Sequence, residues 1–137
     1  MSDPLLFRKT ILLVEDEADT AEMFSEMLRL SGYDVMQAYS GQSVLSLIIN
    51  SKPDAVVLDV VLPDISGLEI LRQIRRDPRI GHIPVVLVSG NSRPSDIEEG
   101  MMAGASVYLT KPISFWELKD ALEDCFQAKW RFKRDED

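Results

Sequence analysis

Residues 56–63 of the 137-residue chain run Val56-Val57-Leu58-Asp59-Val60-Val61-Leu62-Pro63, with one carboxylate in an otherwise apolar stretch. A short run rich in valine indicates a β-strand, which we expect over residues 55–59. Because apolar side chains occupy both faces of this strand, it is typical of a parallel strand buried between two layers of helices. The sequence therefore predicts an α/β protein with this strand in the middle of its sheet.

Three further apolar runs end in polar side chains in the same way. They are residues 10–14 before Glu15-Asp16-Glu17, residues 85–88 before Ser89-Gly90, and residues 107–110 before Lys111-Pro112. A weaker strand is expected over residues 33–38, and segments with apolar residues at helical spacing separate the strands. Strands that alternate with helices pair in parallel through right-handed crossovers. The pattern predicts a doubly wound five-stranded parallel sheet in the flavodoxin-like order 2-1-3-4-5, with helices on both faces and a crevice between the first and third strands.

The starts of the last three helices share one signal. Ser66, Ser95 and Ser114 are each followed three residues later by a glutamate. This spacing predicts a capping box, in which the serine and the glutamate each accept a backbone N–H of the other. In the fourth helix we expect Met101 and Met102 to lie in the core, because apolar residues at helical spacing usually do. Trp116 fits a core and a surface position equally well.

Composition limits the size and the partners of the protein. At 45% hydrophobic content the chain suits one domain, which we expect at residues 10–127 between an N-terminal extension (1–9) and a C-terminal tail or truncated linker (128–137). The formal net charge of −8 disfavours direct nucleic-acid binding and anionic membranes. The single Cys125 excludes an intramolecular disulfide and fits a reducing cytoplasm. No run of sequence approaches the ~20 apolar residues of a membrane span.

Acidic side chains gather at the predicted crevice. Glu15, Asp16 and Glu17 by themselves also fit the first turn of a helix, where the macrodipole favours acids. Asp59 adds a further carboxylate, and two carboxylates about 5 Å apart repel by roughly 3 kcal/mol at an effective dielectric of about 20. A cation should therefore lie between them, and an oxygen-only site that retains water suits Mg²⁺. Zinc is disfavoured because its His and Cys ligands are lacking here.

A lysine and a serine follow the other two strands. Pro112 restricts the backbone of Lys111 to the extended region, which holds the lysine over the strand ends. Ser89 is followed by Gly90, which gives a phosphoryl oxygen close access to the backbone. Alone, Lys111 also fits a solvated position and Ser89 a turn cap. Together with the acids, these side chains indicate a metal-assisted phosphate site.

These spaced motifs, which extend over residues 10–125, resemble those of the receiver domains of two-component response regulators. The resemblance implies that Asp59 is the phosphoacceptor. It implies that Glu15 and Asp16 are the acidic metal pair and that the carbonyl of Val61 is a metal ligand. Glu15 stands where many receivers carry aspartate, so direct and water-mediated binding of Mg²⁺ by Glu15 both stay open.

The resemblance also implies a switch. Ser89 would be the switch hydroxyl and Tyr108 the rotating aromatic residue, while Lys111 precedes a candidate cis-proline at Pro112. Attraction of the serine to a phosphoryl group would vacate space that the tyrosine can fill. This movement would couple the site to a face made by the fourth helix, the fifth strand and the fifth helix.

The function implied is Mg²⁺-dependent phosphoryl transfer to Asp59 from the phosphohistidine of a histidine kinase or a histidine phosphotransfer protein. The switching face would bind a downstream protein, and a phosphorylation-dependent homodimer is a further implied state. Such a domain takes part in its own phosphorylation and dephosphorylation without turning over an independent substrate. A dehalogenase-like phosphatase is disfavoured because Val61 stands where a second acid is needed, and a flavodoxin-type module because its phosphate would meet Glu15, Asp16 and Glu17. A receiver-like scaffold that is not phosphorylated and a receiver excised from a longer regulator both stay open.

Overall fold

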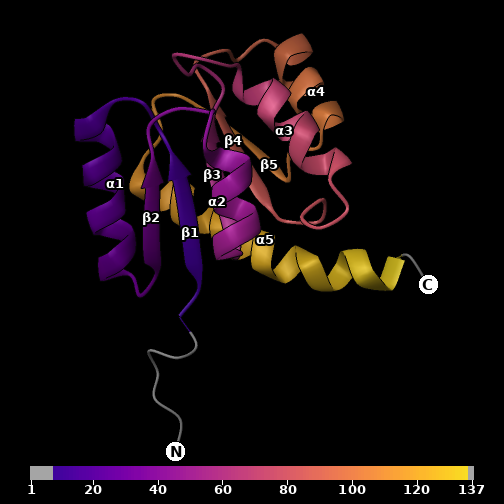
Figure 1. Ribbon diagram of the computed structural model, residues 1–137, viewed down its shortest axis with the longest axis horizontal. Coiled ribbons are helices and arrows are strands. Elements are labelled where there is room, and N and C mark those ends of the chain that lie inside the picture. Colours follow the sequence, from indigo (N-terminus) through magenta and orange to yellow (C-terminus); the bar gives the residue numbers. More distant parts are fainter. Residues whose placement is uncertain (1–7, 136–137) are drawn as a thin grey trace, which may run out of the picture.

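The computed structural model of the chain contains one sheet of five parallel strands. It describes the backbone of residues 8–135 and the side chains of residues 8–127. The strands are β1 (Thr10–Val14), β2 (Asp34–Ala38), β3 (Ala55–Asp59), β4 (Val85–Ser89) and β5 (Val107–Thr110). Their order is β2-β1-β3-β4-β5, which confirms the predicted order and puts β3 at the centre of the sheet (Figure 1).

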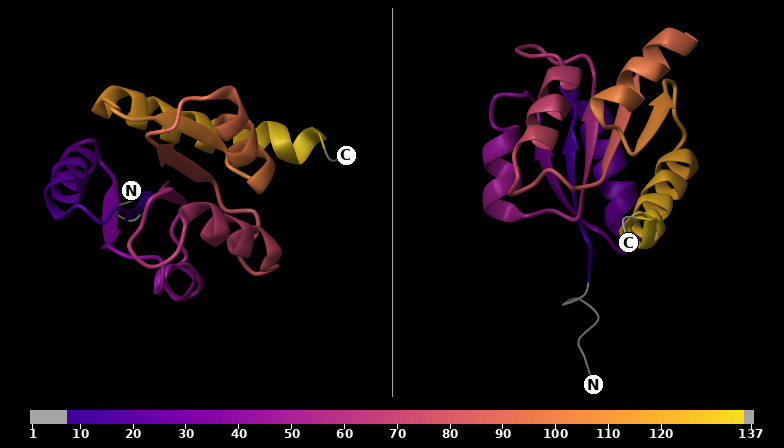
Figure 2. Two further views of the ribbon diagram at one scale, coloured as in Figure 1. Left: turned by 90° about the horizontal axis from the view of Figure 1, so that it is seen from above. Right: turned by 90° about the vertical axis from the view of Figure 1, so that its right-hand side faces the viewer.

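Five helices cover both faces of this sheet. They are α1 (Ala18–Leu30), α2 (Val44–Ser51), α3 (Gly67–Arg76), α4 (Pro94–Ala103) and α5 (Phe115–Asp135). Seen from above, α1 and α5 lie on one side of the sheet and α2 and α3 on the other (Figure 2). Helix α4 packs against α3. The layers are those predicted for a doubly wound fold.

The hydrophobic core consists of two clusters, one on each face of the sheet. Alternate residues of β1 belong to different clusters, because successive side chains of a strand point to opposite faces of the sheet. Leu12 and Val14 pack with α2 and α3, whereas Ile11 and Leu13 pack with α1 and α5. Every residue of β3 is buried, as predicted. Burying each large apolar side chain contributes about 1.5–3 kcal/mol, so the central strands form a firm base for the side chains at their ends.

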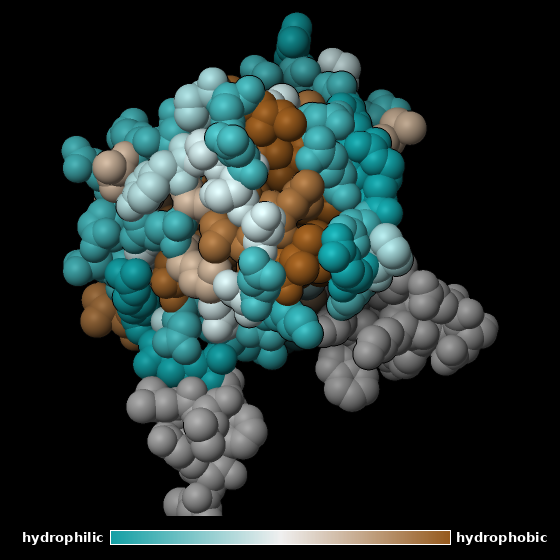
Figure 3. All heavy atoms as spheres, in the orientation of Figure 1, coloured by the Kyte–Doolittle hydropathy of each residue, from teal (hydrophilic) through white to brown (hydrophobic). Residues whose placement is uncertain are grey.

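Helix α2 is unusually apolar for a helix at the surface. Its residues Leu45, Leu47 and Ile49 are half-buried and pack against the core cluster on that face. Figure 3 shows hydrophobic residues gathered in the middle of the face that carries α2. The helix thereby covers part of the same face of the sheet as α3.

The capping box at Ser114 is confirmed. The N–H of Ser114 donates to Glu117 Oε1 at 3.1 Å, and the N–H of Glu117 donates to Ser114 Oγ at 3.1 Å. At the start of α3, Ser66 is the N-cap, but its Oγ accepts the N–H of Leu68, and the reciprocal bond from the Ser66 N–H to the Glu69 carboxylate is not formed. Only half of that predicted motif is therefore present.

The predicted cap at Ser95 is wrong. Helix α4 begins at Pro94 with Arg93 as its N-cap, so Ser95 lies inside the first turn. Proline suits this position because the first N–H groups of a helix have no partner within the helix, and the fixed φ of proline matches the helix. The proline therefore decides where α4 begins, two residues earlier than a cap at Ser95 would place it.

The prediction that the methionine pair lies in the core is also wrong. Met101 is 45% exposed and Met102 is 81% exposed, and Trp116, which fitted either position, is 66% exposed. The buried residue of α4 is Gly100, whose missing side chain leaves room for the ring of Tyr108. A tyrosine from the sheet thus takes the place that a core residue of α4 would fill.

Some element bounds differ from those predicted. Strand β2 begins at Asp34 because the N–H of Tyr33 donates to the Leu28 carbonyl and belongs to the end of α1. Helix α5 continues to Asp135, across the boundary predicted after residue 127. Residues 1–7 of the predicted N-terminal extension and the last two residues lie outside the described part. Within that part, no helix is long and apolar enough to cross a membrane.

Candidate functional site

Asp59 lies at the carboxyl end of β3 and is only 4% exposed. Pairing with β4 continues one residue beyond it, since the N–H of Val60 donates to the Val88 carbonyl at 2.9 Å. The start of α3 lies directly against the Asp59 backbone. A Cβ at Gly67 would collide with the Asp59 carbonyl oxygen, so glycine is needed for this close approach. The sheet and α3 together hold the aspartate at the crevice.

Three predicted acids meet at this point. One carboxylate oxygen each from Glu15, Asp16 and Asp59 lies within 4.8 Å of the other two. Glu15 is only 8% exposed. Burial, and to a smaller extent the charge of Asp59, raises the pKa of Glu15, although the N–H of Glu17 donates to its carboxylate at 3.1 Å. Glu15 therefore carries its negative charge at a cost in this pocket.

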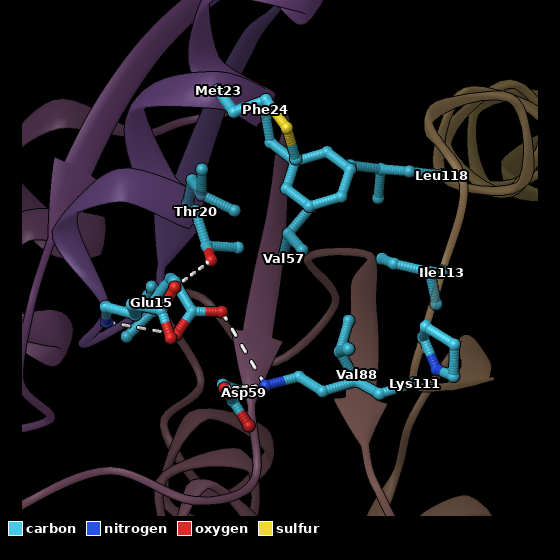
Figure 4. Close-up of a pocket in the computed structure, with 14 residues that line it drawn as sticks. Glu15, Thr20, Met23, Phe24, Val57, Asp59, Val88, Lys111, Ile113 and Leu118 are labelled. Atoms are coloured by element: carbon cyan, nitrogen blue, oxygen red, sulfur yellow. Dashed lines mark hydrogen bonds and ion pairs between the residues drawn. The ribbon is translucent and has the colours of Figure 1, made fainter.

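Lys111 is the cation that faces these acids. Its Nζ lies 2.6 Å from Asp59 Oδ2 and 3.7 Å from Glu15 Oε1 (Figure 4). Burial lowers the pKa of Lys111, but the hydrogen bond and charge of Asp59 outweigh this effect, so the pKa of the lysine is raised overall. The peptide bond between Lys111 and Pro112 is cis, which confirms the candidate cis-proline.

Both oxygens of the Asp59 carboxylate have partners. Oδ2 accepts from Lys111, and Oδ1 accepts the backbone N–H of Val61 at 3.0 Å. The side chain of Val61 itself is 68% exposed. The loop after β3 therefore touches the aspartate through its backbone, and this contact was not apparent from the sequence.

Ser89 and Tyr108, predicted as a switch pair, are joined through the backbone of Asn91. Ser89 is 2% exposed, and its Oγ accepts the Asn91 N–H at 3.0 Å. The carbonyl of the same residue accepts the Tyr108 hydroxyl at 2.8 Å. A movement of the serine hydroxyl would therefore disturb the backbone of Asn91, whose carbonyl also binds the tyrosine. This link could not be read from the sequence, because it uses main-chain atoms.

A cavity of about 430 Å³ adjoins the acids. It extends between α1 and the beginning of α5, and Figure 4 shows Phe24, Ile113 and Leu118 around its apolar end. Thr20 and Met23 complete the wall on the α1 side. The predicted crevice is therefore polar at the strand ends and apolar toward the helices.

The arrangement has an excess of negative charge, because three carboxylates face one ammonium group. Carboxylate oxygens are the ligands that hard divalent cations prefer, and the exposed Asp16 leaves one side open to water. Glu15, Asp16 and Asp59 are the residues able to hold such an ion. A carboxylate can also act as a nucleophile, and Asp59 lies beside a lysine that can offset the charge of an anionic substrate.

Comparison with known proteins gives the family of the chain. A sequence model described as the response regulator receiver domain matches residues 11–123. The polar-differentiation response regulator DivK of Brucella ovis is 33% identical over 106 residues, which cover 77% of this chain and 86% of DivK. The phosphate regulon transcriptional regulatory protein PhoB of Pseudomonas aeruginosa is 37% identical over 110 residues, which cover 80% of this chain. The chain spans about half of PhoB, 48% of its length.

Solved structures agree with this assignment. A response regulator from Chloroflexus aurantiacus is 34% identical, with a TM-score of 0.81, and the match covers 86% of this chain and 97% of that one. The chemotaxis response regulator CheY4 of Vibrio cholerae is 25% identical, also with a TM-score of 0.81, over 86% of this chain and 98% of CheY4. With the sheet order and the site described above, these matches show that the chain belongs to the response regulator receiver domain family of two-component signalling.

Proposed function

We propose that the chain accepts a phosphoryl group on Asp59 from the phosphohistidine of a histidine kinase or a histidine phosphotransfer protein. The observation that carries the proposal is the burial of this carboxylate between the acids Glu15 and Asp16 and the ammonium group of Lys111. An Asp59 oxygen would form a bond to phosphorus while the P–N bond of the donor breaks. The product is an acyl phosphate, and the histidine leaves as imidazole after its nitrogen takes up a proton.

Different residues would orient the Asp59 carboxylate and compensate the charge of the phosphoryl group. Lys111, which lies beside Asp59 Oδ2, would offset negative charge on the phosphoryl oxygens. Val61 holds Oδ1 through its N–H and so orients the nucleophile. The buried hydroxyl of Ser89 would donate to a phosphoryl oxygen once its bond with the Asn91 N–H is given up.

We further propose that Glu15, Asp16, Asp59 and the carbonyl of Val61 hold Mg²⁺. The donor set fits this ion, because crowded oxygen ligands with excess negative charge suit a hard cation. When bound, Mg²⁺ would neutralise charge between these carboxylates and the incoming phosphoryl group. The longer side chain of Glu15 is compatible with direct contact and with contact through water.

Phosphoryl uptake tests the proposed function directly. Incubation with Mg²⁺ and a small phosphodonor such as acetyl phosphate should add one phosphoryl group to the intact protein, as measured by mass spectrometry. The adduct should be lost at alkaline pH, as expected for an acyl phosphate. If no adduct forms under conditions that phosphorylate a control receiver, the chain is a receiver-like scaffold and the proposal is wrong.

The output would leave through the face formed by α4, β5 and α5, where a downstream protein or a second copy of the chain would bind. Tyr108 belongs to β5 in this face, with its ring against Gly100 of α4, and its hydroxyl donates to the carbonyl of Asn91. A shift of the Asn91 peptide would therefore change how the tyrosine packs under α4. Two-state elements of this kind are what switching proteins use.

Replacement of the tyrosine tests this coupling. In the wild-type protein, beryllofluoride with Mg²⁺ should shift the NMR signals of amides near Asp59 and of amides in α4 and α5. In Tyr108→Ala, the shifts near Asp59 should remain while most of the shifts in the two helices are lost. Tyr108→Phe, which lacks only the hydroxyl that binds Asn91, should give an intermediate response. Full retention of the distant shifts in the alanine variant would show that the coupling uses another element.

A further inference from the structure

The loop between β3 and α3, residues 60–66, is joined to the loop between β2 and α2 by one carboxylate. Asp64 Oδ1 accepts the N–H of Gly41 at 2.8 Å, and Asp64 Oδ2 accepts the N–H of Gln42 at 2.8 Å. The same carboxylate accepts the N–H of Ile65 at 3.0 Å. Because these backbone N–H groups donate to the charged form, they lower the pKa of Asp64, with the bond from Gly41 as the largest cause. The side chain is therefore a charged clamp between two loops.

A second contact holds the same two loops together. Gly41 lies so close to α3 and its preceding loop that a Cβ at this position would collide with the side chains of Ile65 and Ile70. Ile70 is fully buried in the core on that side of the sheet. The β2–α2 loop thus packs against the core. This packing fixes the position of the backbone N–H groups that donate to Asp64.

The other end of the clamped loop touches the nucleophile. Val61, three residues before Asp64, donates its N–H to Asp59 Oδ1. Val61 has an exposed side chain, so packing contributes little to its position. The loop is closed at its base by the bond from the Gly67 N–H to the Val60 carbonyl at 2.8 Å. Between these points, Leu62 and Ile65 pack against the core, and Asp64 supplies the hydrogen bonds to the β2–α2 loop.

We propose that Asp64 is a positioning residue for Asp59. By holding the β3–α3 loop against the β2–α2 loop, it keeps the Val61 N–H on Asp59 Oδ1 and so orients the carboxylate for attack. The effect on phosphoryl transfer rests on the function proposed above, whereas the effect on the orientation of Asp59 does not. Small displacements of a reacting group are costly, since a misplacement of about 1 Å can slow a reaction by roughly 100-fold.

Asp54 offers a matched control. It lies at the opposite end of β3, and its Oδ2 accepts the N–H of Thr10 at 2.7 Å. Like Asp64, it is an exposed aspartate whose carboxylate accepts from the backbone of a distant segment, although it accepts one N–H there where Asp64 accepts two. Asp54→Ala removes such a bond far from Asp59. It therefore measures how much stability is lost when any side-chain bond of this kind between two segments is removed.

The experiment compares the wild-type protein with Asp64→Ala, Asp64→Asn and Asp54→Ala. In the metal-free proteins, NMR should show altered shifts of the Val61 amide and of the Asp59 carboxyl carbon in Asp64→Ala, and wild-type shifts in Asp54→Ala. With Mg²⁺ and acetyl phosphate, Asp64→Ala should be phosphorylated about tenfold more slowly, within the range of such positioning effects. Asp64→Asn keeps one acceptor oxygen and should fall between Asp64→Ala and the wild type.

The two kinds of measurement separate the possible failures. If Asp64→Ala lowers stability as Asp54→Ala does but leaves the Val61 and Asp59 signals and the rate unchanged, Asp64 only closes a loop and the proposal is wrong. If Asp54→Ala changes those signals as much as Asp64→Ala, the effect is general loosening and the proposal is again wrong. If the wild-type protein takes up no phosphoryl group, the proposed function fails, and the NMR signals alone decide whether Asp64 orients Asp59.

Discussion

Asp59→Asn is expected to abolish phosphoryl uptake. The substitution keeps the size of the side chain, and the amide oxygen can still accept the N–H of Val61, but a carboxamide is not a nucleophile toward phosphorus at neutral pH. Among the three clustered acids, only Asp59 lies at the end of the central strand and within 2.6 Å of Lys111. Mass spectrometry after incubation with Mg²⁺ and acetyl phosphate measures the loss.

Asp54→Asn serves as the control for this result, because Asp54 immediately precedes the same strand and lies far from the acids. It should be labelled as fast as the wild-type protein. Peptide mapping should find the label of the wild-type protein on the segment that contains Asp59. Labelling of Asp59→Asn at the wild-type level would show that another carboxylate, most directly Asp16 or Glu15, is the acceptor.

Mg²⁺ is expected to raise the thermal stability of the protein, and removal of a clustered acid should weaken this response. A ligand that binds only the folded state stabilises it by about 2.7 kcal/mol at 100 times its Kd. For a domain of this size, each kcal/mol raises Tm by about 2–8 °C. Asp16→Asn and Glu15→Gln should each show a smaller shift with Mg²⁺, because each removes a negatively charged oxygen from the site.

The same two substitutions should stabilise the protein when metal is absent. For Glu15, burial raises the pKa above its ordinary value of 4.5, so the folded state favours the neutral form. Protonation of Glu15 therefore stabilises the folded state. This stabilisation is complete when the pH is below the ordinary pKa, and it is lost as the pH rises through the raised pKa of the folded protein. At pH 7 the charged Glu15 is therefore unfavourable, and Glu15→Gln should raise the Tm of the metal-free protein.

Glu26→Gln, on an exposed part of α1, is the control for the metal experiment. It changes the net charge equally but lies outside the acid cluster, so it should leave the Mg²⁺-dependent shift unchanged. Thermal denaturation monitored by circular dichroism, with EDTA or with increasing Mg²⁺, gives each Tm. An equal rise in Tm for the wild-type protein and both cluster variants would contradict a site at Glu15 and Asp16.

The sheet order and the set of side chains at the strand ends could both be predicted from the sequence. Both follow from signals that are local along the chain, such as the apolar run of β3 and the polar residue that ends each strand. Parallel strands joined by right-handed crossovers bring their carboxyl ends to one edge. For this reason Asp59, Lys111 and the acids after β1 could be assigned to one crevice before any distance was known.

Two predictions made from local signals were wrong, one at the start of α4 and one at its methionine pair. Pro94 took the first position of α4 in place of a start at Ser95, and the ring of Tyr108 filled the space beside Gly100, so Met101 and Met102 face outward. Periodicity shows which face of a helix is apolar. It does not show which neighbour covers that face, because the covering side chain comes from another part of the chain.

The contacts that orient the site were decided only by the tertiary structure. The Val61 N–H on Asp59, the Asn91 peptide between Ser89 and Tyr108, and the Asp64 clamp on the β2–α2 loop all use backbone N–H or carbonyl groups. Every residue other than proline carries the same two backbone groups, so residue type does not reveal which of them will be used. Their partners are set by loop geometry, which depends on how segments distant in the sequence pack against the sheet.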